Sequence, residues 1–413
     1  MKPLWASIIV LQLTVFAGKH DRISTPASVM VTLPRSVAQV RSVVLKTADG
    51  KEIIGQLTEP SLLSPAAETR EGEVRRELHF ILPKLKASKE LTLEATIRPG
   101  PQAKLQAFRW HDTPGEFTEL RFGDRPIMRY MCKALEDSTP EARELTYKVF
   151  HHLFDPSGKR LVTKGPGGKY SHHRGLFYGF NRVTYGDGKK VDIWHCKGDT
   201  HQAHAGFLSS EEGPVIGRHR AKVMWYGVLS EREDQLFAQE DREMMAYDVP
   251  GGILVEFASR LSAIAANVRL DGDPQHAGFH FRADNEVAAQ TSAQTYFLRP
   301  DGKGKPAETR NWPGRKDHVN LPWNAMSFVL GGKRYTVAYL DKPTNPKEAR
   351  FSERDYGRFG SYFEYELDGS KSLDVSYRIW LQEGEMTVEQ VAAKSADFIQ
   401  PAKVTARVGF RAE

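Results

Sequence analysis

The chain has 413 residues, 40% of them hydrophobic and 27% charged, a balance typical of a soluble globular protein and not of a disordered one. This length exceeds one ordinary hydrophobic core, so we expect two domains. The 58 Lys and Arg residues are interspersed with 52 Asp and Glu residues, leaving a net charge of +6. Because no basic stripe with aromatic neighbours occurs, we expect no nucleic-acid partner.

The two cysteines, Cys132 and Cys196, are too few for a disulfide scaffold, and they fit either one bridge or two free thiols. Residues 1–17 have the pattern of a secretory signal peptide: Lys2, then an apolar run ending at Val15 and Ala17. The run is shorter than the roughly 20 residues of a membrane-spanning helix, so a membrane anchor is less favoured. No later stretch is apolar enough to span a bilayer, and we predict a periplasmic or secreted protein.

Residues 27–100 alternate short apolar segments with polar turns, as in the turn Asp49-Gly50 between two apolar segments. Strands at this spacing predict a small immunoglobulin-like β-sandwich. The sequence Pro99-Gly100-Pro101 then marks a domain boundary.

Residues 116–413 continue the rhythm of strands and turns. Gly331-Gly332, between Ser327–Leu330 and Tyr335–Leu340, is a strong hairpin signal. Helices are few, and the capping box that begins at Thr387 opens one near the C-terminus. We therefore predict a mainly β fold in which this second domain is a large antiparallel β-sandwich, with a mutarotase-like supersandwich as one form, and a C-terminal helix.

Eight of the 14 histidines lie between His151 and His219. The turn Gly186-Asp187-Gly188 predicts a hairpin centred on Asp187, and extending its register places His173 opposite His201, with His204 just beyond. Imidazoles that converge with a nearby carboxylate can ligate zinc or a transition metal. His173, His201 and His204 are therefore the candidate ligands, and a divalent metal is the candidate cofactor.

The same region also fits acid–base chemistry. The candidate catalytic residues are His172, His173 and His204 as acids or bases, with Arg174 to bind or polarise a substrate oxygen. The alternative is that these are half-exposed histidines at strand ends, making ordinary hydrogen bonds. The helical His-Glu-x-x-His pattern and Cys-x-x-Cys pairs of common metal sites are absent from the sequence.

Other side chains are suited to substrate binding. Trp194 and His195 offer a stacking wall for a sugar ring, although strand aromatics more often belong to a core. His280 and Arg282 share the polar face of an alternating strand. Tyr356 lies in a charged, aromatic loop that is suited to closing over a ligand.

Several motifs resemble an uncharacterised bacterial family whose members are labelled "PmoA family protein" or "methane oxygenase PmoA". They are Tyr147–Gly158, His172–Phe177, Arg125–Tyr130, Val191–Trp194 and Arg354–Gly360, and the likeness covers residues 116–385. The methane monooxygenase membrane subunit is a bundle of transmembrane helices, and the strand-rich pattern here contradicts that label. The resemblance implies an exported protein of bacteria that degrade polysaccharides, with a sandwich that binds or transforms sugars.

Taken with the His/Arg site, the resemblance implies an exported carbohydrate-processing enzyme that acts as an epimerase, a lyase or a glycoside-cleaving enzyme. Two other functions stay open: a non-catalytic glycan-binding or surface-assembly protein, and a metal-dependent oxidoreductase. The expected partner is a carbohydrate or another small molecule.

Overall fold

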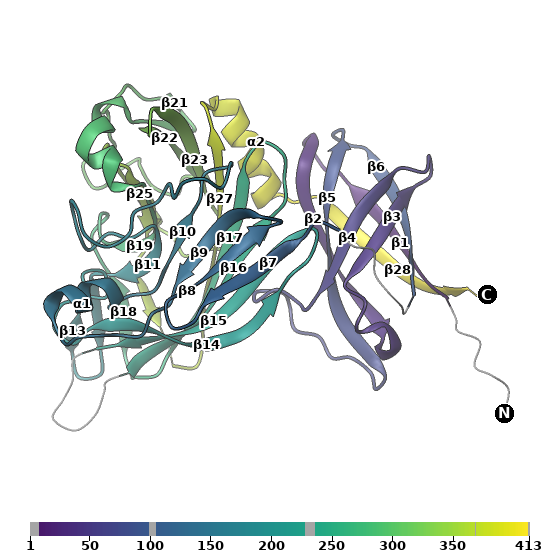
Figure 1. Cartoon of the computed structure of the whole chain (residues 1–413), viewed down its shortest axis with the longest axis horizontal. Coiled ribbons are helices and arrows are strands. Elements are labelled where there is room, and N and C mark those ends of the chain that lie inside the picture. The colour runs from purple at the N-terminus through teal and green to yellow at the C-terminus, as the bar shows by residue number, and fades with distance from the viewer. Residues whose placement is uncertain (1–7, 99–104, 228–235, 368, 412–413) are drawn as a thin grey trace.

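The computed structural model describes residues 8–98, 105–227, 236–367 and 369–411 (Figure 1). The fold is mainly β, as the sequence predicts, with large antiparallel sheets and few helices. The predicted boundary at Pro99-Gly100-Pro101 lies outside the described residues. In the described part of the chain, no helix combines the length and the apolar character that crossing a membrane requires.

The small domain is built on one seven-stranded antiparallel sheet with the order β2-β5-β4-β3-β6-β1-β28. Its outermost strands, β2 and β28, lie against each other, so the sheet curls around its own core. The strands are β1 (Ile8–Phe16), β2 (Arg22–Pro34), β3 (Ser42–Thr47), β4 (Glu52–Thr58), β5 (Glu73–Leu85), β6 (Glu90–Ile97) and β28 (Lys403–Arg411), with a 3₁₀ turn η1 (Arg35–Val37) after β2.

Strand β1 gives the apolar N-terminal run a different role from the predicted signal peptide. It pairs with β6 on one side and β28 on the other. Ile9, Leu11, Leu13 and Val15 alternate inward and are at most 3% exposed, in the core of the small domain. A short apolar run fits a signal peptide and a buried strand equally well, and here the strand accounts for it. Export stays a prediction.

The chain returns to the small domain at its C-terminus. Strand β28 pairs with β1 over nine residues, so 403–411 belong to the first sheet and not to the large domain predicted over residues 116–413. The predicted C-terminal helix is α2 (Val388–Ile399), and its capping box at Thr387 and Gln390 is formed as predicted. Arg22 of β2 pairs with Asp397 of α2 at 2.8 Å, which fixes the helix against the small domain.

The large domain is a sandwich of two antiparallel sheets. The eight-stranded sheet contains, in spatial order, β24 (Arg350–Arg354), β25 (Arg358–Tyr362), β19 (Ala277–Arg282), β11 (Leu176–Phe180), β10 (Phe150–Leu153), β9 (Arg125–Met131), β8 (Phe117–Phe122) and β7 (Phe108–Thr113). The nine-stranded sheet contains β14 (His201–Glu211), β15 (Ile216–Tyr226), β16 (Leu236–Tyr247), β17 (Ile253–Ala263), β27 (Leu373–Glu383), β23 (Lys333–Asp341), β22 (Trp323–Leu330), β20 (Tyr296–Arg299) and β21 (Gly302–Lys303).

The two sheets share one core in which aromatic rings meet. Phe279 of β19 stacks on Phe257 of β17, with ring centroids 4.3 Å apart. The remaining elements are a four-stranded sheet and short helices: β13 (Lys189–Val191), β12 (Arg182–Tyr185), β18 (Val268–Asp271), β26 (Tyr365–Leu367), α1 (Pro140–Thr146), the π-helix η2 (Val287–Thr291) and the 3₁₀ turn η3 (Ser292–Gln294).

Both hairpin turns predicted from the sequence are present in the structure. Gly331 and Gly332 both have positive φ, 59° and 74°, and join β22 to β23 as predicted. Val183 pairs with Val191, symmetric about Asp187, so the second predicted turn is also confirmed. This hairpin is short, however, because β11 does not extend its first strand but pairs within the eight-stranded sheet.

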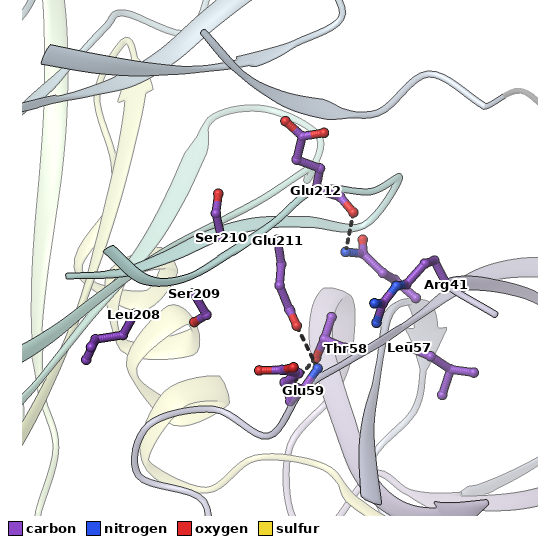
Figure 2. A pocket seen from close by; sticks show the side chains of 10 residues that line it. Arg41, Leu57, Thr58, Glu59, Leu208, Ser209, Ser210, Glu211 and Glu212 are labelled. Atoms are coloured by element: carbon purple, nitrogen blue, oxygen red, sulfur yellow. Dashed lines mark hydrogen bonds between the residues drawn. The ribbon is translucent and has the colours of Figure 1, made fainter. Parts of the chain in front are cut away.

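The two domains meet through buried polar contacts. The Gln56 Oε1 of β4 accepts hydrogen bonds from the backbone N–H groups of Val215 and Ile216, each at 2.9 Å. Beside this contact lies a cavity of about 490 Å³, lined by Arg41 and by residues at the ends of β4 and β14 (Figure 2). Glu211 spans it and accepts a hydrogen bond from the Glu59 N–H at 2.6 Å.

Candidate metal centre

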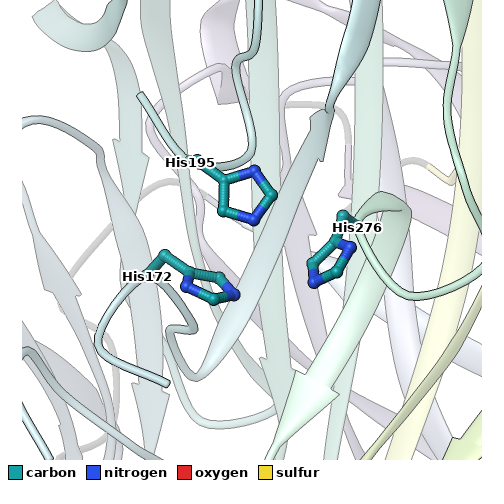
Figure 3. A group of neighbouring side chains, drawn as sticks. All are labelled: His172, His195 and His276. Carbon is teal, nitrogen blue, oxygen red and sulfur yellow. The ribbon is translucent and has the colours of Figure 1, made fainter. Parts of the chain in front are cut away.

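Three histidines from separate segments converge in the large domain (Figure 3). His172 precedes β11, His195 follows β13, and His276 precedes β19. Each can offer a ring nitrogen, and these three nitrogens all lie within 4.8 Å of one another. Among the described residues this is the one group of three or more His, Cys, Asp or Glu side chains with that geometry.

The cluster lies on the outer face of the eight-stranded sheet. Phe279 and Phe281 of β19 point into the core, so the alternating residues His280 and Arg282 face outward. The Trp194 ring packs 4.8 Å from the His280 ring, and the turn that carries His195 therefore covers this face. Gly175 lets the segment that carries His172 lie close to β10, because a Cβ there would lie 2.4 Å from the His151 carbonyl oxygen.

Two of the three imidazoles are oriented by carboxylates. Asp192 Oδ2 lies 2.7 Å from His195 Nδ1, and Asp273 Oδ1 lies 2.9 Å from His276 Nδ1. In both pairs the aspartate precedes the histidine by three residues. With Nδ1 bonded to a carboxylate, Nε2 is the nitrogen left for a ligand. Carboxylates of this kind fix the tautomer and ring orientation of metal-binding histidines.

The third imidazole, His172, has no such carboxylate. Its Nε2 is buried and has no hydrogen-bond partner among the described residues. Burial, followed by the neighbouring His195 and Lys148, lowers the pKa of His172 to about 2, so its ring is neutral and keeps a lone pair. The Lys148 Nζ donates to the carbonyl oxygens of His172, at 2.9 Å, and of Trp194, and so ties together the segments carrying His172 and His195.

The histidines are open to solvent on one side, since the side chains of His195 and His276 are 20% and 22% exposed. His173 lies beside them, with its ring centroid 4.4 Å from that of His172 and 5.7 Å from that of His276. The exposed Tyr170 packs on Tyr356, with ring centroids 4.6 Å apart, and both rings border His173. An aromatic wall therefore adjoins the cluster.

The predicted metal set of His173, His201 and His204 does not form, because those side chains are not a convergent group. His201 begins β14 and stacks on Tyr226 of the neighbouring strand, with ring centroids 4.5 Å apart. His204 lies 3.3 Å from the Tyr130 hydroxyl, in a second group of aromatic and histidine rings. The prediction failed because the hairpin ends at Val191.

That second group is a buried polar network. His151 Nε2 and His219 Nε2 lie 2.9 Å apart, and Trp110 stacks on His219 with ring centroids 4.6 Å apart. Burial lowers the pKa of both histidines, that of His219 to about 3, so both rings are neutral. His204, proposed from sequence as an acid or base, belongs here and not to the three-histidine cluster.

Arg174, the predicted oxygen-binding cation, is 2% exposed and bonds to the backbone. Its guanidinium donates to the carbonyl oxygens of Ser171, His173 (3.1 Å) and Glu144 (2.6 Å). It lies over the rings of Tyr147 and Phe150, 5.1 and 5.8 Å from their centroids. Arg174 therefore holds the His172–His173 segment in place.

The other predicted residues do meet around the cluster. His172 and His195 are two of its three members, and Trp194, His280, Arg282 and Tyr356 adjoin it. His276 was missed, as were the roles of Asp192, Asp273 and Lys148. The repeated spacing Asp192-x-x-His195 and Asp273-x-x-His276 is the sequence signal that would have pointed to His276.

Fold and site together define a two-sheet antiparallel β-sandwich with a three-histidine cluster on its outer face. The chain belongs to the family of unknown function DUF6807, whose sequence profile matches residues 118–396. No curated protein matches the chain. The resemblance to the PmoA-labelled family stays a prediction.

Two solved structures are similar at 9% sequence identity. One is a protein in the glycosyl hydrolase family 38 from Enterococcus faecalis (TM-score 0.43), matched over 99% of this chain and 48% of that one. The other is an alpha-mannosidase from Enterococcus faecalis V583 (TM-score 0.40), matched over 97% of this chain and 46% of that one. The chain thus spans about half the length of these structures, and a likeness at these scores carries no argument about activity.

Proposed function

We propose that this protein is a metal-dependent carbohydrate-processing enzyme in which His172, His195 and His276 hold a divalent ion. The observation that carries the proposal is the pair of Asp-x-x-His units, which orient two imidazoles toward a third whose Nε2 is buried and unpartnered. Three protein ligands with an open fourth position are typical of catalytic zinc sites.

A divalent ion held in this way acts as a Lewis acid on a substrate oxygen or a water molecule. The protein's own groups position the reaction. Lys148 fixes the backbone of His172 and Trp194, and Asp192 and Asp273 fix the rings of His195 and His276. We assign the acid or base role to His173, whose ring lies beside that of His172.

Carbohydrate as the substrate class is supported by the aromatic wall. Tyr170 is 41% exposed and lies against Tyr356, so its ring offers an apolar face to the C–H groups of a sugar. The same wall would serve a glycan-binding protein without catalysis. Metal-dependent turnover separates the two functions, and a redox-active ion in place of zinc would favour an oxidoreductase.

Metal binding is the first test. After dialysis against a chelator, calorimetric titration with Zn²⁺ should give one ion per chain, and Co²⁺ should give the strong visible absorption of a four-coordinate site. His276→Ala should weaken binding at least about a hundredfold, because only two imidazoles remain. His204→Ala is the matched control and should bind normally. Substoichiometric binding by the wild type, or unchanged binding in His276→Ala, would overturn the proposal.

Turnover is the second test. A panel of glycosides and oligosaccharides should include at least one that the zinc-loaded protein converts and the chelator-treated protein does not. His173→Ala should abolish this conversion and leave zinc binding intact. If glycans bind but no zinc-dependent conversion is found, the enzyme proposal fails and the glycan-binding function replaces it.

A further inference from the structure

Two of the most deeply buried arginines form no ion pair with an acidic side chain in the described part of the chain. Arg22, Arg218, Arg242 and Arg299 are also fully buried, and each has a carboxylate oxygen within 2.8 Å. Arg282 and Arg358 are 0% exposed, and no carboxylate of the described residues lies within 4.0 Å of their nitrogens. An unpaired buried charge is costly, and the four pairs show one way in which this protein compensates it, whereas Arg174 donates to backbone carbonyl oxygens instead.

The two unpaired arginines also repel each other. Arg282 of β19 lies directly opposite Arg358 of β25 in the antiparallel pairing, so both side chains point to the same face of the sheet. Like charges directly opposite each other destabilise a sheet. Burial, reinforced by Arg358, lowers the pKa of Arg282 to about 10, which leaves it charged at neutral pH.

Part of the hydrogen-bonding capacity of this pair is unused. Arg282 donates to the carbonyl oxygens of Ala283 (2.9 Å) and Tyr356, while its Nε and Nη2 have no hydrogen-bond partner among the residues that the structure describes. Arg358 donates to Ser352 Oγ (2.9 Å) and contacts His280 Nδ1 (3.1 Å), while within the described ranges its Nε has no hydrogen-bond partner. A guanidinium with free N–H groups matches the paired oxygens of an oxyanion.

The arginine pair adjoins the three-histidine cluster. Arg358 donates to the Pro274 carbonyl at 3.3 Å, in the turn that carries His276. The Arg282 guanidinium lies 4.9 Å from the centroid of the Tyr356 ring, and that ring packs against the exposed Tyr170. The arginine pair therefore lies next to both the aromatic wall and the turn that carries His276.

We infer that Arg282 and Arg358 form a binding site for an oxyanion of the substrate: a carboxylate, sulfate or phosphate group. Such a group supplies the negative charge that the pair lacks and accepts its unused N–H groups. A carbohydrate substrate would then be a sugar acid or a sugar ester. The link to the substrate rests on the proposed function, whereas the anion site itself does not.

The test measures anion binding to the chelator-treated and the zinc-loaded protein by calorimetry and by the shift in melting temperature. The probes are sulfate, phosphate, glucuronate and neutral glucose, with chloride holding the ionic strength constant. At least one oxyanion should bind tenfold or more tightly than glucose and raise the melting temperature of the wild type. The oxyanion that binds most tightly identifies the source: glucuronate a sugar acid, sulfate or phosphate an ester.

Arg282→Gln should weaken this binding at least tenfold. If that variant fails to fold, Arg282→Lys keeps the charge, loses the planar fork, and should show the same loss. Arg260→Gln is the control, because Arg260 is a partly exposed residue paired with Asp374 at 2.8 Å, and it should bind anions normally. Equal binding of glucose and all oxyanions, or unchanged binding in the folded Arg282 variant, would overturn the inference.

The two proposals can fail separately. If the protein binds zinc but shows no preference for oxyanions, the proposed anion site is wrong and the proposed metal centre stands. Oxyanion binding by a protein that takes up no zinc does the reverse, because the arginine pair needs no metal to attract an anion.

Discussion

Replacing Asp273 with asparagine tests whether the Asp-x-x-His units exist to orient metal ligands. Asp273 accepts hydrogen bonds from His276 Nδ1 (2.9 Å), the Gln275 N–H (2.9 Å) and Asn181 Nδ2 (2.6 Å). Burial opposes its ionisation, but the bond from His276 and the others outweigh burial and hold the pKa of Asp273 below its usual range. The side chain is therefore an anion that accepts from His276 Nδ1 and orients the imidazole.

The expected loss of zinc affinity depends on which interactions of Asp273 an asparagine can still make. Its amide oxygen can still accept from His276, so the ring stays oriented, whereas the negative charge is gone and the amide N–H₂ now faces the Asn181 donor. Changes of such outer partners typically cost 10- to 100-fold in metal affinity, or roughly 1.4–2.7 kcal/mol. Asp192→Asn should cost about the same, and if the two sites act independently the double variant should lose roughly the product.

The assay is a competition titration of zinc against a chromophoric chelator at pH 7.5. Asp374→Asn is the control, because Asp374 pairs with Arg260 and contacts no member of the cluster. Melting temperatures without metal should match the wild type within a few degrees, which separates a loss of affinity from unfolding. If Asp273→Asn and Asp192→Asn both bind zinc as tightly as Asp374→Asn, the second-sphere role is refuted.

Three further predictions concern stability and the site's scaffold. Glu353 is 0% exposed and pairs with Arg299 at 2.6 Å. Burial opposes its ionisation, but His318, whose Nε2 lies 3.3 Å from the Glu353 carboxylate, and Arg299 lower its pKa to about 2. Glu353→Gln should therefore lower the free energy of unfolding, measured by urea denaturation at pH 7, by about 3–5 kcal/mol. In the wild type, ionised Glu353 stabilises the fold above pH ~4.5, and this stabilisation is lost as the pH falls toward ~2. If Glu353→Gln lowers the free energy of unfolding by less than ~1 kcal/mol at pH 7, the buried ion pair does not have the predicted role. Burial raises the pKa of Asp341 to about 6, so its ionisation destabilises the fold. In the same assay, Asp341→Asn should raise the free energy of unfolding by up to about 3 kcal/mol above pH ~6 and leave it unchanged below pH ~4. A variant that is less stable than the wild type at pH 8 would refute this prediction. Gly175→Ala places a Cβ 2.4 Å from the His151 carbonyl oxygen, so the His172 segment must shift; calorimetry should find weaker zinc binding, and unchanged binding would show that the segment tolerates the shift.

The sequence alone determined the fold class and several turns, because those features depend on neighbouring residues. Period-two alternation predicts strands wherever it occurs, and Gly331-Gly332 predicts a tight turn, since both residues adopt positive φ. The capping box at Thr387 is equally local, with its partner three residues away. The turn centred on Asp187 was predicted for the same reason.

Only the tertiary structure decided which strands share a sheet and which histidines meet. Strands β1 and β28 pair although nearly the whole chain separates them, so neither could be assigned to its sheet from its own residues. His173 and His201 were expected to face each other by extending a hairpin, but β11 pairs with β19 and β10 instead.

The candidate metal centre also has one part that is local in the sequence and one part that depends on the tertiary structure. Each Asp-x-x-His pair is a local unit within one turn, and both are legible in the sequence. Their convergence with His172 depends on two loops folding over the outer face of one sheet, where Gly175 lets the chain approach β10 and Lys148 joins the loops. Sequence spacing fixes contacts within a turn, whereas contacts between loops are fixed by the sheet that supports them.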